Sequence, residues 1–227
     1  MVERASPGGP GASFAGRVRE ALATHPPRRL PEEQCDFRAA VTLLLAPAAA
    51  PPGAGGADPS FDVAGVAALF VHRARVDGDP WSGHIALPGG RSDPADRDLL
   101  ATALREMREE TGIVLEPREV LGRLDELHPR TSHLPSIGIT PFVAWLSARP
   151  EVELNHELAG HLWIPVADLA SLAHRSLLLR ESLTPRRFPT IEYAGAVIWG
   201  LTFAVVDDFL SRLGLRPPGP PPEGLPA

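Results

Sequence analysis

The chain has 227 residues, of which 44% are hydrophobic and 22% are charged, and this balance excludes disorder along its whole length. Its 21 glycines and 26 prolines gather in three stretches, which we expect to form two flexible ends and one inserted loop: 7–11, 217–226 and 47–59. The net charge is −6, arginine replaces lysine throughout, and no basic run occurs, so we expect no nucleic-acid partner.

The cysteine content and the distribution of apolar residues indicate the expected cellular compartment. The single cysteine, Cys35, excludes an internal disulfide and a cysteine-rich metal site. Residues 1–30 hold no continuous apolar segment, and no stretch reaches the roughly 18–20 apolar residues of a membrane span. We therefore expect a cytoplasmic protein without a membrane partner. The expected organisation is an N-terminal helix and flexible segment (1–35), one enzyme-sized domain (36–213) and a Pro/Gly-rich tail (214–227).

Hydrophobic periodicity predicts strands interspersed with helices, which is typical of an α/β fold with a mixed central sheet. Helices are expected over 14–25, about 95–111, 166–174 and 197–213. Strands are expected over 38–46, 66–72, 113–115, 119–124, 137–146 and 162–166. Loops are expected over 47–60, 75–86, 127–136 and 181–195.

Three carboxylates on the predicted helix before Gly112 carry the strongest chemical signal. Glu106, Glu109 and Glu110 fall within an arc of about 100° on a helical wheel, where like charges three and four residues apart repel. A hard divalent cation would balance them, and oxygen ligands suit Mg²⁺ or Mn²⁺. The alternative is a solvated acidic helix face.

The surrounding residues favour the metal interpretation. Leu87-Pro-Gly-Gly90 precedes the helix, and we expect a tight turn there that brings backbone N–H groups close to the carboxylates. Asp93-Pro94 is a suitable helix start. Arg105 can hold the adjacent Glu106 in place through a bidentate ion pair.

This arrangement resembles the motif of the Nudix hydrolase family, G-x5-E-x7-R-E-U-x-E-E-x-G-U, in which U is aliphatic. Here Gly90 is followed by five residues, Asp96, eight residues and then Arg105-Glu-Met-Arg-Glu-Glu-Thr-Gly-Ile113. Asp96 replaces the first glutamate, and one extra residue separates it from the arginine. The resemblance implies an α/β/α sandwich, a divalent metal, and hydrolysis of a nucleoside diphosphate linked to another moiety.

The resemblance also implies roles for individual residues. Arg105 would orient Glu106, and a helix carboxylate or Glu157 would accept the proton of the attacking water. The implied metal ligands are Glu106, Glu109, Glu110 and, through water, Asp96. Gly89 and Gly90 would shape the turn beside the helix. Candidate contacts to the phosphates of a small-molecule nucleotide substrate are Arg73, Arg91 and Arg130. Homodimers are common in the family.

Within the family, the chain is similar to the coenzyme A diphosphatase branch. The similar segments are Pro-Gly-Gly-x-x-Asp-Pro-x-Asp at 88–96, Thr-Ala-Leu-Arg-Glu at 102–106, Ile-Trp-Gly-Leu-Thr at 198–202 and Arg-Ala-Ala-Val at 38–41. The branch also tends to carry the extra residue of the motif. This similarity implies cleavage of CoA or an acyl-CoA to 3′,5′-ADP and 4′-phosphopantetheine.

The upstream motif of that branch is incomplete here. Leu69–Ala74 lacks its second arginine, and Leu87 replaces its phenylalanine, although Gly83 is kept. Two alternatives therefore stay open. One is a Nudix hydrolase that acts on ADP-ribose, NADH, a nucleotide sugar or a nucleoside triphosphate. The other is a Nudix-fold ligand sensor without turnover.

Overall fold

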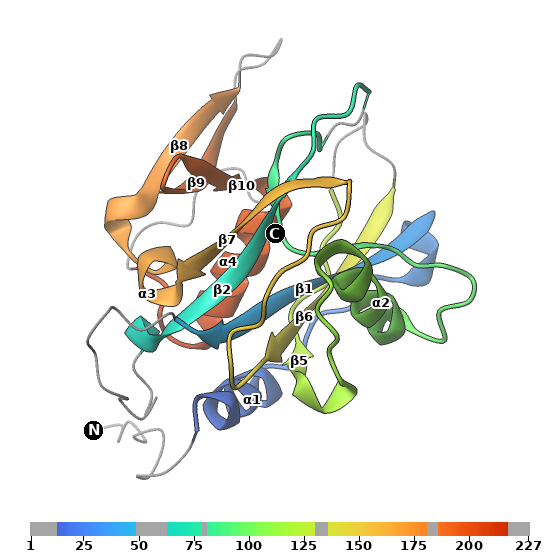
Figure 1. Cartoon of the computed structure of the whole chain (residues 1–227), viewed down its shortest axis with the longest axis horizontal. Helices are drawn as coiled ribbons and strands as arrows, with labels where there is room; N and C mark the ends of the chain where they lie inside the picture. Colours follow the sequence, from blue (N-terminus) through green and yellow to red (C-terminus); the bar gives the residue numbers. More distant parts are fainter. Residues whose placement is uncertain (1–12, 49–62, 79–80, 130–135, 181–185, 218–227) are drawn as a thin grey trace.

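The computed structural model describes residues 13–48, 63–78, 81–129, 136–180 and 186–217 (Figure 1). Its helices are α1 (Phe14–Thr24), α2 (Leu99–Thr111), α3 (Val166–Leu169) and α4 (Gly200–Arg212). Its strands are β1 (Phe37–Pro47), β2 (Val66–Arg73), β3 (Ile85–Ala86), β4 (Gly89–Arg91), β5 (Val120–Arg123), β6 (Ile137–Trp145), β7 (Leu158–Pro165), β8 (Arg175–Arg180), β9 (Arg186–Tyr193) and β10 (Ala196–Trp199).

The main sheet mixes parallel and antiparallel pairs. Its order is β3-β2-β1-β6-β5, with β4 paired to β1 and β7 paired to β2. The parallel pair is β1 with β6, which runs in register from Phe37 opposite Ile137 to Leu45 opposite Trp145. Strands β8, β9 and β10 form a second antiparallel sheet, which Figure 1 shows at the upper left and which contacts the main sheet through β10 and β3.

Helices cover both faces of the main sheet. Leu44 of β1 packs with Met107 of α2 on one face, whereas Leu43 packs in the cluster that contains Val18 of α1 and Phe209 of α4 on the other. Strand β1 is therefore buried on both sides, which explains its continuous apolar run. The predicted α/β/α sandwich with a mixed central sheet is confirmed.

Several sequence expectations differ from the structure. Residues 113–115 alternate between buried and exposed side chains as a strand would, yet they form no strand. Ile113 and Leu115 instead pack in the apolar cluster that contains Met107 of α2. The predicted loop over 181–195 contains β9, and the predicted helix over 197–213 begins only at Gly200, after β10. The predicted helix over 166–174 is the short helix α3 followed by a 3₁₀ turn.

Helix α2 begins later than expected, at Leu99. Asp98 caps it, because its side chain accepts the N–H of Ala101 at 2.8 Å. Asp93 instead accepts the N–H of Ala95, which forms a turn before the helix. The predicted C-terminal cap is confirmed, since Gly112 has a φ of 70° and donates its N–H to the Arg108 carbonyl.

The described part of the N-terminal segment belongs to the same core as the sheet. Phe14, Val18 and Leu22 of α1 are buried there, and the helix packs against β5. The domain boundaries drawn from the sequence stay a prediction, and residues 49–60 of the expected insertion lie outside the described residues. No helix in the described ranges combines the length and apolar character needed to cross a membrane.

Arg212 of α4 links three segments that are distant in sequence. Its guanidinium bonds Asp208 at 2.9 Å, Asp125 after β5, and the carbonyl of His25 after α1. The side chain is only 8% exposed. We expect Arg212→Ala to lower the free energy of unfolding by about 2–3 kcal/mol, because it removes the ion pairs to two partly buried carboxylates, although Asp125 keeps its ion pair with Arg28.

Urea denaturation tests this prediction. The control is Arg97→Ala, which removes an exposed ion pair of 3.5 Å with Asp98 and should change the free energy of unfolding by about 0–1 kcal/mol. Equal effects of the two substitutions would show that the Arg212 contacts do not hold the segments together.

Candidate functional site

The site begins where α2 packs against the Gly89–Gly90 pair. The expected tight turn is instead strand β4, which pairs with Ala39–Val41 of β1. The Gly89 N–H is directed to α2 and donates to Glu110 Oε2 at 2.8 Å. Because β4 is paired with β1, this hydrogen bond fixes the position of the Glu110 carboxylate relative to the main sheet.

Both glycines are required by close contacts. A Cβ on Gly89 would lie 2.2 Å from the Ala40 carbonyl oxygen of β1, and the residue has a φ of +149°. A Cβ on Gly90 would lie 2.6 Å from Cδ and Oε1 of Glu106. The absence of a side chain at Gly89 thus allows the backbone of β1 to approach closely, whereas at Gly90 it leaves room for the Glu106 carboxylate.

The two glycines should respond differently to alanine. Gly89→Ala forces backbone apart, so we expect it to lower the free energy of unfolding by about 2 kcal/mol or more. Gly90→Ala pushes aside a flexible side chain, so we expect nearly unchanged stability and a fall in hydrolysis of about tenfold or more. Thermal unfolding and initial rates, measured on both variants, check this. Equal destabilisation by the two substitutions would contradict it.

Arg105, a residue of α2, is the centre of a network of ion pairs. Its Nη1 bonds Glu106 at 2.9 Å and Glu109 at 3.0 Å, and its Nε and Nη2 bond the two oxygens of Asp96 at 3.0 and 2.9 Å. Nη2 also donates to the Arg91 carbonyl at 3.0 Å. One guanidinium therefore orients two helix carboxylates and anchors them to the turn before the helix.

Asp96 lies in that turn with a side chain only 7% exposed. Besides Arg105, it accepts the Thr102 hydroxyl and the Asp93 N–H, each at 2.9 Å. The extra residue in the motif places Asp96 one turn ahead of the helix, where a shorter side chain still reaches the arginine. This geometry favours a role in positioning Arg105 over the metal-ligand role expected from the sequence.

Burial and like charges shift the acidity of the cluster. The pKa of Glu110 is raised to about 7, mainly by burial and further by the charges of Glu106 and Glu157, against the Gly89 N–H and Arg73. Burial also raises the pKa of Glu106, although Arg105 opposes it. Hydrogen bonds from Arg105 hold the pKa of Asp96 well below its usual range. Only part of the negative charge on this helix face is therefore compensated.

The donor chemistry fits a hard divalent cation, because the groups are carboxylates: the charge of Glu109 raises the pKa of Glu106, and the charge of Glu106 raises the pKa of Glu110. Within the described ranges, however, no three His, Cys, Asp or Glu side chains are placed to hold one ion as they stand. Glu106 and Glu109 face Arg105, and Glu110 faces Gly89. Binding of an ion thus requires these side chains to turn toward a common point.

The predicted substrate contacts divide into three cases. Arg73, at the end of β2, lies close enough to Glu110 for its charge to lower the pKa of that carboxyl group. The Arg91 guanidinium lies over the Phe37 ring, 4.6 Å from its centroid. Arg130 lies outside the described residues.

Two polar residues near the cluster received no role from the sequence. Thr102 is fully buried and donates to Asp96, and a hydroxyl four residues into the helix gives no pattern that would reveal this. Asn155 donates its backbone N–H to the Glu110 carbonyl at 3.2 Å and accepts the Glu157 N–H on its side chain at 2.9 Å. These contacts hold the Glu157 loop beside the C-terminal end of α2.

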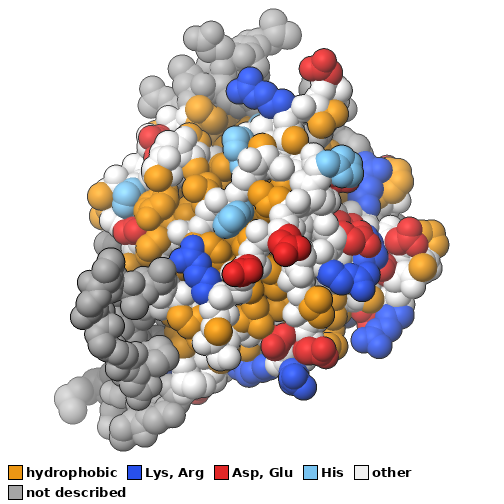
Figure 2. All heavy atoms as spheres, viewed as in Figure 1, with side chains coloured by type: hydrophobic (Ala, Val, Ile, Leu, Met, Phe, Trp, Pro, Cys, Tyr) orange, Lys and Arg blue, Asp and Glu red, His pale blue; other side chains and the backbone are white. Residues whose placement is uncertain are grey.

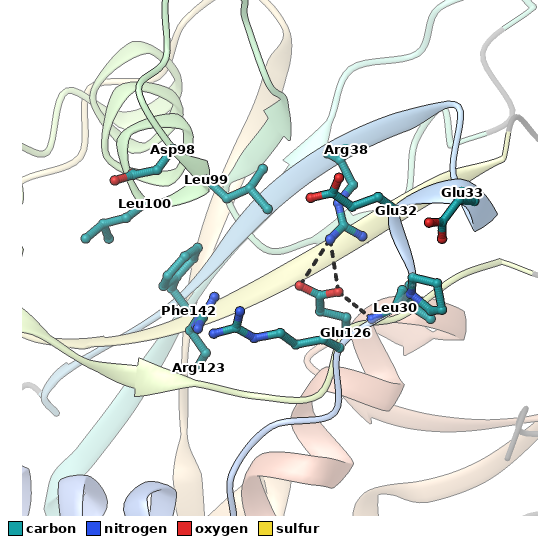
Figure 3. Close-up of a pocket in the computed structure, with 12 residues that line it drawn as sticks. Leu30, Glu32, Glu33, Arg38, Asp98, Leu99, Leu100, Arg123, Glu126 and Phe142 are labelled. Carbon is teal, nitrogen blue, oxygen red and sulfur yellow. Dashed lines mark hydrogen bonds and ion pairs between the residues drawn. The ribbon is translucent and has the colours of Figure 1, made fainter.

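A cavity of about 840 Å³ lies away from this cluster (Figure 3). It lies beside the N-terminal end of α2, where Arg38 and the Leu30 N–H bond the buried carboxylate of Glu126 at 3.2 and 2.7 Å. None of the site residues expected from the sequence lines it. Figure 2 shows acidic and basic side chains intermixed over the face that carries α2. We therefore place the candidate site at the Arg105-centred cluster.

Comparison with known proteins agrees with this geometry. The family model described as NUDIX domain matches residues 61–186, more than half of the chain. An uncharacterized Nudix hydrolase, NudL, of Yersinia pestis (strain Pestoides F) is 34% identical over 137 residues, which cover 59% of this chain and 66% of the relative. The match thus spans just under two thirds of that relative's length.

One solved structure shows the same fold at low identity, and a second is similar over part of the chain. A MutT/nudix family protein from Enterococcus faecalis is 16% identical, with a TM-score of 0.50 and coverage of 90% of this chain and 81% of its own. The NUDIX domain of Shewanella oneidensis NrtR, complexed with ADP ribose, is 22% identical, with a TM-score of 0.42 and coverage of 66% and 84%. The NUDIX domain match over more than half of its length shows that the chain belongs to the Nudix family.

Proposed function

We propose that this protein hydrolyses a nucleoside diphosphate linked to another moiety, in a reaction that depends on Mg²⁺ or Mn²⁺. The observation that carries the proposal is the α2 carboxylate trio, seated on Gly89 and Gly90 and balanced in part by Arg105. Nudix hydrolases generally use divalent metals such as these. A solvated acidic helix face does not explain why Glu110 is 4% exposed.

In this proposal Glu106, Glu109 and Glu110 hold the metal. The bound ion would polarise a phosphoryl oxygen and lower the pKa of a coordinated water. Arg105 pairs with Glu106 and Glu109 before the ion binds, and Asp96 keeps Arg105 in place through two parallel hydrogen bonds. Asp96 is thus a positioning residue.

Two groups can accept the proton of the attacking water. Glu110 is buried beside Gly89, and Glu157 lies on the following loop, close enough for its charge to raise the pKa of Glu106 and Glu110. We also propose that Arg73, at the end of β2, contacts the diphosphate; its support is that its charge acts on Glu110. The roles proposed for Gly89 and Gly90 are structural, since their side-chain positions are filled by β1 and Glu106.

For the substrate, we propose CoA or an acyl-CoA first, cleaved to 3′,5′-ADP and 4′-phosphopantetheine. The support is the similarity of residues 88–96, 102–106 and 198–202 to the CoA diphosphatase branch. The alternatives are ADP-ribose, NADH, a nucleotide sugar and a nucleoside triphosphate. Homodimerisation stays a prediction.

A hydrolysis panel tests the proposal. CoA, ADP-ribose, NADH, UDP-glucose and dNTPs are incubated with Mg²⁺, and the products are resolved by mass. We expect cleavage within a diphosphate linkage, with CoA as the best substrate. Cleavage of another diphosphate with inert CoA would overturn the substrate assignment alone. Inertness of the whole panel, with metal still bound, would favour a ligand sensor.

A further inference from the structure

A second cavity, of about 480 Å³, lies between the edge of the main sheet and the β9–β10 hairpin. Residues of β2, β3 and β7 form one wall, and the hairpin residues Ala194–Val197 form the other. Trp199 also lines it, and its ring contacts His84 with ring centroids 4.9 Å apart. Strand β10 packs against β3, so the cavity is a product of the extra sheet seen in Figure 1.

Two segments lead from this cavity directly to the carboxylate cluster. On β2, His72 lines the cavity while the next residue, Arg73, lies near Glu110, and the strand register shifts between these two residues. A shift of this kind redirects neighbouring side chains. On the other segment, Gly83 and Ile85 line the cavity, and the chain then continues into β4. The cavity and the cluster therefore lie on two sides of the end of β2.

The lining combines apolar side chains and glycines with two histidines, His72 and His161. No Asp, Glu or Arg of the described ranges lines it, in contrast to the Arg105 cluster on the other side of β2. Three glycines, Gly83, Gly160 and Gly195, line it together with apolar side chains, and their backbone groups are not covered by side chains of their own. The His72 Nε2–H already donates to the Gly83 carbonyl at 3.1 Å. Such walls suit a ligand with apolar surface and a few hydrogen-bonding groups.

We propose that this cavity binds the uncharged end of the diphosphate substrate and thereby sets specificity. This inference rests on the proposed function, because the diphosphate must lie at the carboxylate cluster for its uncharged end to reach the cavity. The chemistry recognised is an uncharged group that carries amide or heterocyclic nitrogen beside apolar surface. A nucleobase and a pantetheine arm both provide it, and the experiment separates them.

Gly160 of β7 offers a clean way to fill the cavity. An added Cβ there meets its nearest neighbour, His72 Cβ, at 3.9 Å, which is ordinary contact, and the backbone is not in the left-handed region. Gly160→Val should therefore fold and occupy space in the cavity. Gly65→Val is the matched control, because a Cβ there has nothing within 4 Å and Gly65 does not line the cavity. Ala196→Leu blocks the cavity from the hairpin side and serves if Gly160→Val does not fold.

Equilibrium dialysis with adenosine and with pantetheine measures the cavity without any turnover. We expect the wild type to bind one of the two, Gly160→Val to weaken that binding by about tenfold or more, and Gly65→Val to leave it unchanged. The probe that binds identifies the end of the substrate that the cavity holds. Failure of the wild type to bind either probe, or equal binding by the cavity-filling variant, would overturn the inference.

A kinetic readout links the cavity to the reaction. With the best substrate of the wild type, Gly160→Val should raise KM by about tenfold with little change in kcat, since it removes binding and leaves the cluster intact. An unchanged KM would contradict the assignment. If no diphosphate is hydrolysed, the proposed function fails, yet the dialysis result still decides whether the cavity binds an uncharged group.

Discussion

Replacement of Glu110 by glutamine is expected to reduce hydrolysis by about a thousandfold or more while leaving the fold intact. The amide keeps an oxygen that can accept the Gly89 N–H, which Glu110 accepts at 2.8 Å. It removes the negative charge that a divalent ion requires. The variant thus separates the chemistry of the carboxylate from its structural contact. Initial rates with the best substrate, at saturating Mg²⁺, measure the effect.

The same substitution should stabilise the metal-free protein above neutral pH. The pKa of Glu110 is raised to about 7, so the stability associated with its protonated form is present at acidic pH and lost as pH rises through 7. Glutamine stays neutral, and we expect a gain in the free energy of unfolding of about 2–3 kcal/mol at pH 8 in the presence of a chelator. Near pH 4 the gain should vanish.

Glu109→Gln is the control for this stability effect. Glu109 is 48% exposed and paired with Arg105 at 3.0 Å, so loss of its charge should not stabilise the metal-free protein. Near-normal turnover by Glu110→Gln would contradict the role of this carboxylate in the reaction. A lower stability of Glu110→Gln at pH 8 would contradict the description of an uncompensated buried charge.

Removal of Arg105 is expected to lower both stability and activity. Arg105→Ala leaves Asp96, which is 7% exposed, without its partner and frees Glu106 and Glu109 to repel each other. We expect a loss of about 3 kcal/mol in the free energy of unfolding and a fall in kcat/KM of about a hundredfold. Arg105→Lys should recover only part of both, because an ammonium group cannot make the parallel bonds to Asp96.

Two controls make this prediction specific. Arg108→Ala removes an exposed arginine of the same helix and should change the free energy of unfolding by less than about 0.5 kcal/mol. In a double-mutant cycle, Arg105→Ala and Asp96→Asn should together cost clearly less than the sum of the two single effects. Additive effects would show that the Asp96–Arg105 contact does not act as a unit.

The sequence predicted the parts of the site that depend on local pattern. The 3.6-residue period located α2, and Gly112 ended it where the left-handed cap was expected. Adjacency predicted a bidentate Arg105–Glu106 pair, whereas the structure shows a single bond between them. Periodicity could not predict the bidentate contact with Asp96. That contact depends on the path of the turn before the helix, which Asp93, Asp98 and the extra residue determine together.

Parts of the fold that depend on distant contacts escaped prediction. Strand β4 consists of two glycines and an arginine, residues of low or ordinary strand preference, and it forms because β1 lies beside it. Strands β8 and β9 lack a clear alternation of buried and exposed residues, since Leu177 is 55% exposed and Pro189 lies within β9. The 480 Å³ cavity, in turn, exists only because β10 packs against the main sheet.

The most direct test of the central claim is a titration of the protein with Mn²⁺, followed by the electron paramagnetic resonance signal of the free ion. The α2 carboxylates must turn from Arg105 and Gly89 to bind an ion, and Glu110 is the most deeply buried of them. We expect saturable binding by the wild type that weakens by about tenfold or more in Glu110→Gln. Equal Mn²⁺ binding by the two proteins, or none by the wild type, would contradict a metal-dependent hydrolytic centre on α2.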